Sequence, residues 1–303
     1  MIFNNKTVIV TGASEGVGAA TARKFAEAGA NLVLVARGKK KLEAIAEELR
    51  DKTRVEIFAM DVADPEACVN VFKKADFEYG RIDVLVNNAG FHERGNVESV
   101  APVDLGRMID VNLRAPIMLT RIALPYIRDA GGGAIINVGS LAGRTPVPGS
   151  AAYSASKSGL RAFTFAIAEE MPKAKIKFAV VSPGPIDTGF IMSDIDNVSD
   201  LTFSQPISTA EEVAQAILDL CGNSQREQSM PAISGVLTSL TYLFPWLGRK
   251  SRPWLEKRGQ RTKSALKAEA RKKKKPVKDN GQENDEQKSS EKAVDKPTDQ
   301  NPK

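Results

Sequence analysis

The sequence predicts an α/β protein with a doubly wound parallel sheet, because short apolar runs alternate with helical patterns up to about residue 230. The runs are rich in Val and Ile and nearly unbroken, as in strands that are buried on both faces. A glycine-rich turn directly after the first run supports the same fold class. We expect strands over residues 6–11, 31–36, 55–59, 82–86, 134–138 and 176–181.

Between these runs, apolar side chains recur three or four residues apart, which is the spacing of helices that bury one face. Leu42, Ile45 and Leu49 follow the second run in this way, and Val213 and Ile217 follow the sixth. Helices that connect parallel strands cover both faces of the sheet. Residues 1–230 are therefore expected to form one Rossmann-type domain.

Composition limits the classes to which the chain can belong. It has 303 residues, of which 42% are apolar and 26% are charged, so it can bury a sizeable core. The chain contains no run of about 18 apolar residues, which is the length needed to span a bilayer. Cys68 and Cys221 form no pair or cluster, which argues against a disulfide scaffold and a thiolate zinc site. With no signal-peptide pattern before Thr11, we expect a cytoplasmic protein.

Residues 231–261 are expected to form an amphipathic helical extension, in which Pro231 starts a helix and Pro245 ends it. Two interpretations of this helix remain open: it covers the core, or it lies on the inner membrane surface, because a basic stretch follows it. Its apolar face contains Ile233, Val236, Leu237, Leu240, Leu243 and Phe244, opposite Ser234, Thr238, Ser239 and Thr241.

The positive charge is concentrated near the end of the chain. The net charge is +6, yet residues 249–278 alone hold 14 basic and 2 acidic residues. Beyond residue 262 almost nothing is apolar, so we expect residues 262–303 to form a charged, disordered tail. Its basic run Arg271–Lys275 lacks interleaved aromatic residues, and we therefore expect no nucleic acid as a partner.

The turn Thr11–Gly18 reads G-x-x-x-G-x-G and lies between the first strand and the first helix. Glycines let the backbone approach a pyrophosphate, whose charge is stabilised by the amides at the helix N-terminus. The turn therefore predicts a dinucleotide site. Its candidate binding residues are Gly12, Ser14, Gly16, Val17 and Gly18.

The end of the second strand indicates which dinucleotide is bound. An NAD site places a carboxylate there, whereas the 2′-phosphate of NADP requires a cation. Here the strand ends in Arg37, and no acidic residue follows before Glu43. A guanidinium can bind a phosphate through two hydrogen bonds, so the sequence favours NADP(H) over NAD(H).

Tyr153 and Lys157 lie four residues apart, on one face of an expected helix. Ionising a free phenol at neutral pH costs about 4 kcal/mol, and one positive charge at about 4 Å offers a similar amount. The pair is therefore a candidate acid–base catalyst. Three polar features lie nearby in the expected fold: Ser140 and Asn87–Gly90 follow strands, and Asn112 lies in an apolar helical stretch.

With these motifs the chain resembles the short-chain dehydrogenase/reductase family over residues 6 to about 230. The resemblance implies that Asn112, Ser140, Tyr153 and Lys157 are the catalytic tetrad. It also implies that Asp61 and Val62 contact the adenine and that Pro183, Gly184, Ile186 and Thr188 hold the nicotinamide. Tyr153 and Lys157 would contact the cofactor too, as would Asn88, Ala89 and Gly90.

The implied chemistry is hydride transfer between the cofactor and a carbonyl or secondary alcohol. Ser140 and Tyr153 would bind the carbonyl oxygen, Tyr153 would donate a proton, and Lys157 with Asn112 would replace that proton through water. No metal is implied. His92 is expected to border the substrate opening rather than to act in catalysis.

Two features depart from the common family pattern. Glu15 stands where many NADP-using members have a base, and the chain lacks a glycine-rich closing strand. Its apolar and then basic ending resembles that of members that act on lipids or steroids. An alternative is a dinucleotide-sensing or scaffold protein that binds a membrane or an acidic partner through the basic tail.

The segment Gly189–Ser208 is expected to set the substrate, together with residues 91–100 and the helix over 231–244. A hydrophobic substrate is favoured because the segment is apolar. The family resemblance also implies a homodimer through the helices over 105–126 and 153–170, with Phe163 and Phe165 in the contact. The apolar residues of the segment are Phe190, Ile191, Met192, Leu201, Phe203 and Ile207.

Overall fold

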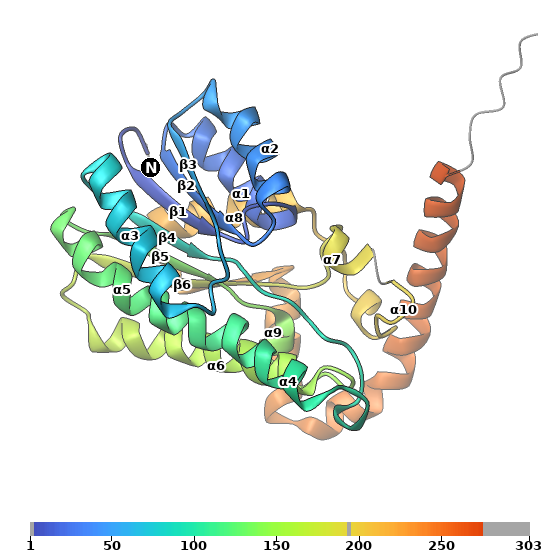
Figure 1. Cartoon of the computed structure of the whole chain (residues 1–303). Helices are drawn as coiled ribbons and strands as arrows, with labels where there is room; N and C mark the ends of the chain where they lie inside the picture. Colours follow the sequence, from blue (N-terminus) through green and yellow to red (C-terminus); the bar gives the residue numbers. More distant parts are fainter. Residues whose placement is uncertain (1–2, 193–194, 275–303) are drawn as a thin grey trace, which may run out of the picture.

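A computed structural model describes residues 3–192 and 195–274 of the chain. In this part, seven parallel strands form one sheet in the order β3-β2-β1-β4-β5-β6-β7. Helices cover both faces of the sheet, which confirms the predicted fold class (Figure 1). The strands are β1 (Thr7–Thr11), β2 (Asn31–Ala36), β3 (Val55–Ala59), β4 (Val84–Asn87), β5 (Gly133–Val138), β6 (Ile176–Pro183) and β7 (Glu227–Met230).

Each face of the sheet has its own apolar core. The helices α1 (Gly16–Glu27), α2 (Lys39–Arg50) and α8 (Ala210–Gly222) bury Phe25, Leu42 and Val213 against one face. The other face is covered by α3 (Pro65–Tyr79), α5 (Ala115–Asp129) and α6 (Ala151–Glu170). Helix starts follow local chemistry: Asp64 caps α3, and Thr209 with Glu212 forms a capping box on α8.

The strand order reverses between β1 and β4. The chain moves outward from β1 through β2 to β3 and then returns to β4, beside β1. The loops after these two strands therefore leave in opposite directions and open a crevice at the carboxyl edge of the sheet, where such folds bind ligands. The short elements near this edge are α4 (Pro102–Ile109), η1 (Val97–Ser99), η2 (Asp110–Arg114), η3 (Leu141–Gly143), α7 (Gly189–Met192) and η4 (Thr202–Ser204).

The sequence prediction omits the seventh strand. Strand β7 pairs in parallel with β6, from Val180 opposite Glu227 to Pro183 opposite Met230. Its sequence, Glu-Gln-Ser-Met, has no β-branched residue and no apolar run, because an edge strand is only half covered. The missing glycine-rich pattern therefore does not mean that a closing strand is missing.

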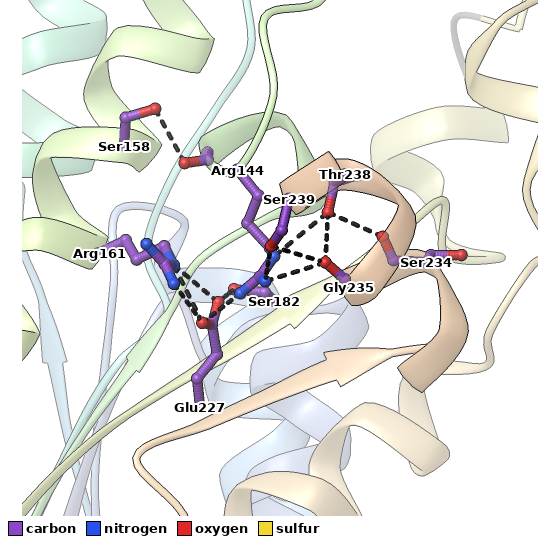
Figure 2. A network of polar contacts seen from close by, with 10 residues as sticks. Arg144, Ser158, Arg161, Ser182, Glu227, Ser234, Gly235, Thr238 and Ser239 are labelled. Carbon is purple, nitrogen blue, oxygen red and sulfur yellow. Dashed lines mark hydrogen bonds and ion pairs between the residues drawn. The ribbon is translucent and has the colours of Figure 1, made fainter. Parts of the chain in front are cut away.

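Polar contacts hold this edge strand in place (Figure 2). The Glu227 carboxylate accepts hydrogen bonds from Ser182 at 2.8 Å and from Arg161 at 2.8 and 3.0 Å, and it also pairs with Arg144. Burial tends to raise the pKa of Glu227, but the hydrogen bonds from Arg161, Arg144 and Ser182 outweigh it and hold that pKa below its ordinary value.

The C-terminal part corrects two predicted boundaries. Helix α9 (Ala232–Leu243) ends near the predicted position, but Pro245 begins α10 (Pro245–Lys274) instead of ending the helical region. The disorder predicted from residue 262 is wrong as far as Lys274, because Lys263 donates to the Val198 carbonyl at 2.7 Å and Leu266 packs on a small apolar cluster. Residues 275–303 lie outside the described part.

The long helix α10 lies beside the segment that follows α7 (Figure 1). Its residues Ala265, Leu266 and Lys267 have high helix propensity, and the contacts with that segment add tertiary stabilisation. Among the helices of the described part, none is both long enough and apolar enough to cross a membrane.

We predict that Glu227→Gln destabilises the fold by about 2–4 kcal/mol, because Arg144 and Arg161 lose their anionic partner. A carboxyl group with a lowered pKa stabilises the folded state above its unfolded pKa, and this effect is lost as pH falls through the folded pKa. Urea unfolding should therefore show a large difference between wild type and variant at neutral pH and a smaller one below about pH 4.

The matched control is Glu169→Gln, because Glu169 forms an exposed ion pair with Arg226. This control should lower the free energy of unfolding by less than about 1 kcal/mol at any pH. Equal effects of the two substitutions would contradict the role given to Glu227.

Candidate active site

A large cavity occupies the crevice at the carboxyl edge of the sheet. Its volume is about 1670 Å³, and its walls come from the loops after strands β1 to β6 and from the C-terminal helices that begin at Ala232 and Pro245. With two exceptions, every residue predicted from the sequence to bind cofactor or to act in catalysis lines this cavity. The exceptions are Gly18 and Asn112, which lie behind the wall and act on its shape.

The glycine turn is shaped by close contacts with the end of β4. Gly12 and Gly16 have φ angles of +67° and +54°, a region that favours glycine. A Cβ atom on Gly18 would lie 2.1 Å from the Gly12 carbonyl oxygen, so only glycine lets α1 approach the turn. Gly18 therefore shapes the turn from behind.

Thr11 and Asn88 fasten the turn to the loop after β4. The Thr11 hydroxyl accepts hydrogen bonds from the backbone amides of Asn88 and Ala89, both at 3.0 Å. The Asn88 side chain donates to the carbonyls of Thr11 and Gly12 at 2.8 and 3.2 Å. Sequence reasoning did not assign a role to Thr11, although its position at the start of the turn was a usable signal.

Charges beside the turn favour an anion. Glu15 occupies the N-cap position of α1 but makes no capping hydrogen bond, because its carboxylate pairs with Lys41 at 2.6 Å. This pairing neutralises the acidic residue that departs from the family pattern. The exposed Arg37 lines the same part of the cavity. Positive-φ glycines, a helix N-terminus and a cation together fit the phosphates of a nicotinamide dinucleotide.

Asp61 and Val62, to which the family resemblance gives the adenine contact, both line the cavity. The Asp61 carboxylate accepts a hydrogen bond from the Ala63 amide at 3.0 Å and pairs with Arg107 at 2.6 Å. The carboxylate is therefore held in one orientation, and its negative charge is balanced by Arg107.

Tyr153 and Ser140 meet at the floor of the cavity, where their side chains share a hydrogen bond. Burial raises the pKa of the Tyr153 phenol, and the Ser140 hydrogen bond and the charge of Arg94 oppose this only in part. In the chain alone, the phenol of Tyr153 is therefore harder to ionise than a free phenol.

Lys157 lies one helical turn beyond Tyr153 on α6, and the residue is only 5% exposed. Its ammonium donates to the Val138 carbonyl at 2.8 Å and lies 5.9 Å from the centre of the Tyr153 ring. Burial lowers the pKa of Lys157 to about 8, so the side chain remains mostly charged at neutral pH.

Asn112 is fully buried in η2, a π-helical turn between α4 and α5. Its side-chain oxygen accepts from the Phe91 amide at 3.0 Å, and its side-chain nitrogen donates to the Phe91 carbonyl at 2.9 Å. A Cβ atom on Gly90 would lie 3.0 Å from the Asn112 oxygen and 3.4 Å from the Lys157 nitrogen. The Asn112 side chain thus positions the loop after β4 next to Lys157.

His92 is closer to the reacting groups than the sequence suggested. Its ring stacks on that of Tyr153, with 4.2 Å between ring centres and 15° between planes. Phe190 contacts the same tyrosine from α7, and Arg94 donates to the Phe190 carbonyl at 2.8 Å. The loop after β4 and α7 together form the wall around the Tyr153 ring, whereas the sequence offered only the position of His92 as a signal.

The apolar segment after α7 divides into two groups. Phe190, Ile191 and Leu201 line the cavity. Phe203 and Ile207 do not line the cavity and pack behind its wall, in an apolar cluster that also contains Ile191, Val198 and Leu266. The Met192 side chain lies outside the described residues.

The fold and the cavity define an α/β protein of the doubly wound type, with its ligand site at the switch point between β1 and β4. Residues 6–198 match the family model "short chain dehydrogenase". This match covers more than half of the chain, and the protein belongs to the short-chain dehydrogenase/reductase family.

Two curated relatives illustrate the range of similar proteins. Sulfoacetaldehyde reductase 2 of Chromohalobacter salexigens is 36% identical over 187 residues, which are 61% of this chain and 74% of the relative. Dehydrogenase/reductase SDR family member 7B of Mus musculus is 33% identical over 237 residues, 74% of this chain and 73% of the relative.

Solved structures show the same architecture. A metagenomic short-chain oxidoreductase in complex with NADP matches with a TM-score of 0.64 and 32% identity, over 75% of this chain and 97% of that one. A short chain dehydrogenase from Mycobacterium paratuberculosis bound to NAD matches with a TM-score of 0.69 over 76% and 97%, and at 23% identity it supports the fold alone.

Proposed function

We propose that the protein is an NADP(H)-dependent oxidoreductase that interconverts a carbonyl and a secondary alcohol in a hydrophobic substrate. The observation that carries this proposal is the group formed by Ser140, Tyr153 and Lys157 on the floor of a cavity whose other end is the glycine turn. Family membership supports the reaction class.

The residues around the cavity fit a nicotinamide dinucleotide. The turn would hold the pyrophosphate through Gly12, Ser14, Gly16 and Val17, with Gly18 behind it, and Arg37 would hold the 2′-phosphate. When bound, the nicotinamide supplies or accepts the hydride. The remaining contacts would come from Asp61, Val62, Asn88, Ala89, Gly90, Tyr153, Lys157, Pro183, Gly184, Ile186 and Thr188.

In this proposal the chain's own groups orient the substrate and move the proton. The hydroxyls of Ser140 and Tyr153 bind the carbonyl oxygen, and Tyr153 donates a proton to it. Lys157 stabilises the resulting phenolate with its charge and returns a proton through water. Asn112, to which the family resemblance gives a share in this step, contributes by holding the loop after β4 beside Lys157. Because Lys157 keeps donors beyond the bond to Val138, its ammonium can serve both tasks.

The cavity wall favours an apolar substrate. Its apolar lining includes Phe190, which contacts Tyr153, and also Leu141, Val147, Leu201 and, from α9, Leu237. Pockets with apolar walls and a few convergent polar groups bind ligands whose polar part is small. The polar part here would be the carbonyl or hydroxyl that meets Ser140 and Tyr153.

We also propose a homodimer through the face formed by α4, α5 and α6, which rests on family resemblance. Of the two aromatic residues expected in that contact, Phe163 packs partly against the core of its own subunit. Phe165 lies beneath Arg161, whose guanidinium is 4.8 Å from the ring centre. Because Arg161 is also bound to Glu227, the half-buried Phe165 is the aromatic residue of α6 that we expect a partner to contact.

The cofactor preference predicts that NADPH binds more tightly than NADH by about 1–3 kcal/mol, or about 5- to 150-fold, through Arg37. Replacing Arg37 by Asp should reverse the preference, because a carboxylate repels the phosphate and accepts from ribose hydroxyls. Fluorescence titration with both nucleotides measures this. Lys39→Asp is the matched control, since Lys39 lies nearby but does not belong to the cavity wall. Equal dissociation constants of wild type for the two nucleotides would contradict the assignment.

The catalytic assignment predicts different losses at the two central residues. Tyr153→Phe should lower kcat by about 10²–10⁴-fold with NADPH affinity nearly unchanged, because only the proton donor is removed. Lys157→Ala should lower both kcat and NADPH affinity. NADPH oxidation with a panel of hydrophobic ketones and aldehydes measures the first quantity, and nucleotide titration the second.

Tyr126→Phe is the control for this pair, because Tyr126 packs beside Phe72 on the opposite side of α5 from the cavity residues. It should retain wild-type turnover. A Tyr153→Phe variant with turnover close to that of wild type would rule out the mechanism.

A further inference from the structure

Helix α9 is amphipathic, but its orientation is the reverse of that expected for a core helix. Its small and polar residues face the domain, and Ser234 is only 2% exposed. Its large apolar residues face outward, with Ile233 at 63% and Leu243 at 68% exposure. The interpretation of α9 as a core-covering helix is therefore wrong for its apolar face.

Specific contacts fix this orientation (Figure 2). Arg144 donates to the Gly235 carbonyl at 3.0 Å and to the hydroxyls of Ser239 and Thr238 at 2.8 and 3.3 Å. A Cβ atom on Gly235 would lie 2.5 Å from the Ser229 hydroxyl, so the polar face packs closely on β7. Rotating the apolar face inward would break these contacts, and the apolar face is therefore a stable feature of the surface.

The outward apolar face of α9 is followed by exposed aromatic residues at the start of α10, and we name these exposed residues together the α9 patch. Contiguous apolar surfaces of this kind mark sites of interaction, since they are unfavourable in water. Two tryptophans belong to it, and tryptophan prefers the boundary between water and lipid. The exposed residues of the patch are Ile233, Val236, Leu237, Leu240, Tyr242, Leu243, Phe244, Trp246 and Trp254.

Positive charge borders the α9 patch. The first half of α10 exposes Arg249, Lys250, Arg252, Lys257 and Arg258 and contains one acidic residue, Glu256, which pairs with Arg252. An apolar surface with a basic border is complementary to a bilayer that carries anionic headgroups, because the acyl region accepts the apolar side chains and the headgroups attract the cations.

We propose that the α9 patch docks on the surface of a membrane that contains anionic lipids. Helix α9 lies flat in the interface with its apolar side chains in the acyl boundary, while Arg144 and its partners hold the polar side on the domain. The docking needs no spanning segment, in agreement with the absence of one among the described helices.

The position of the cavity gives this docking a consequence. Leu237, Pro245, Arg249 and Trp254 line the cavity, and Leu237 and Trp254 also belong to the α9 patch. The cavity therefore reaches the docking surface. On the basis of the proposed function, a hydrophobic substrate would pass between the bilayer and Tyr153 through this opening without crossing water.

The test is co-sedimentation of the full chain with vesicles of neutral phosphatidylcholine and with vesicles that also contain anionic phosphatidylglycerol, at low and high salt. The patch variant is Leu240→Ser with Leu243→Ser, and the charge variant is Lys250→Glu with Lys257→Glu. These four residues are not part of the cavity wall. The control is Phe77→Ser, because Phe77 is 87% exposed on α3, outside the patch.

Wild type and control should bind anionic vesicles, and neutral vesicles at least tenfold more weakly. The patch variant should lose about tenfold or more of the binding, at low and at high salt. The charge variant should lose a similar factor at low salt and much less at high salt, where headgroup attraction is screened. Thermal melts and NADPH titration on the same samples show that each variant is folded, and they test the proposed function separately.

Two results would overturn the proposal: no binding of wild type to anionic vesicles, or equal binding of wild type and the patch variant. Light scattering on the same proteins identifies the competing occupant. One outcome is a monomeric patch variant beside a wild type that is a larger species and does not bind vesicles. In that case the α9 patch joins two copies of the chain, and the membrane proposal is wrong.

Discussion

A buried ammonium group is the constraint on which the architecture of the site depends. Lys157 is enclosed by the end of β5, whose Val138 carbonyl accepts a hydrogen bond from the ammonium at 2.8 Å, and by the loop after β4. Burying a charge is unfavourable unless polar groups surround it. The Val138 carbonyl is such a polar group, and two glycines let the chain pack closely around Lys157. Gly90 leaves room beside the ammonium, and a Cβ on Gly143 would lie 2.7 Å from the Lys157 backbone.

A chain of buried amides and hydroxyls extends this arrangement into the sheet. Asn87 on β4 donates to Asn137 on β5 at 2.8 Å, and Asn137 donates to Thr164 on α6 at the same distance. Nearer the start of α6, Asn112 donates to Ser156 at 3.2 Å. Removing the partner of a buried polar group destabilises the folded state, so these contacts fix the position of α6 relative to the strands. Tyr153 and Lys157 are thereby placed by the core of the domain.

The sequence predicted those parts of the structure in which local chemistry and burial agree. Strands β1, β2, β4, β5 and β6 are apolar because both of their faces are covered, and the glycine turn needs backbone conformations that few residues adopt. Strand β7 escaped prediction because its stability comes from the charged partners of Glu227, which are distant in sequence. The outward orientation of α9 also could not be read from its periodicity, since Arg144 and Gly235 decide which face turns inward.

The candidate site shows the same division. The positions of Ser140, Tyr153 and Lys157 around one cavity follow from strand ends and helix spacing. Three other contacts of the site depend on loop conformation. They are the stacking of His92 on Tyr153, the two hydrogen bonds between Asn112 and Phe91, and the ion pair of Glu15 with Lys41. Periodicity carries no information about such loops, so these contacts required the structure.

The central claim of the proposed mechanism is that the raised pKa of the Tyr153 phenol falls when Lys157 acts together with the bound oxidised cofactor. The chain has four tyrosines, so ultraviolet difference titration of wild type against Tyr153→Phe isolates the ionisation of this one. With saturating NADP⁺, the pKa of Tyr153 should fall below the value of about 10 for free tyrosine, and Lys157→Met should abolish this fall. A Tyr153 pKa that stays above about 10 with NADP⁺ bound, or that is the same in Lys157→Met, would contradict the account.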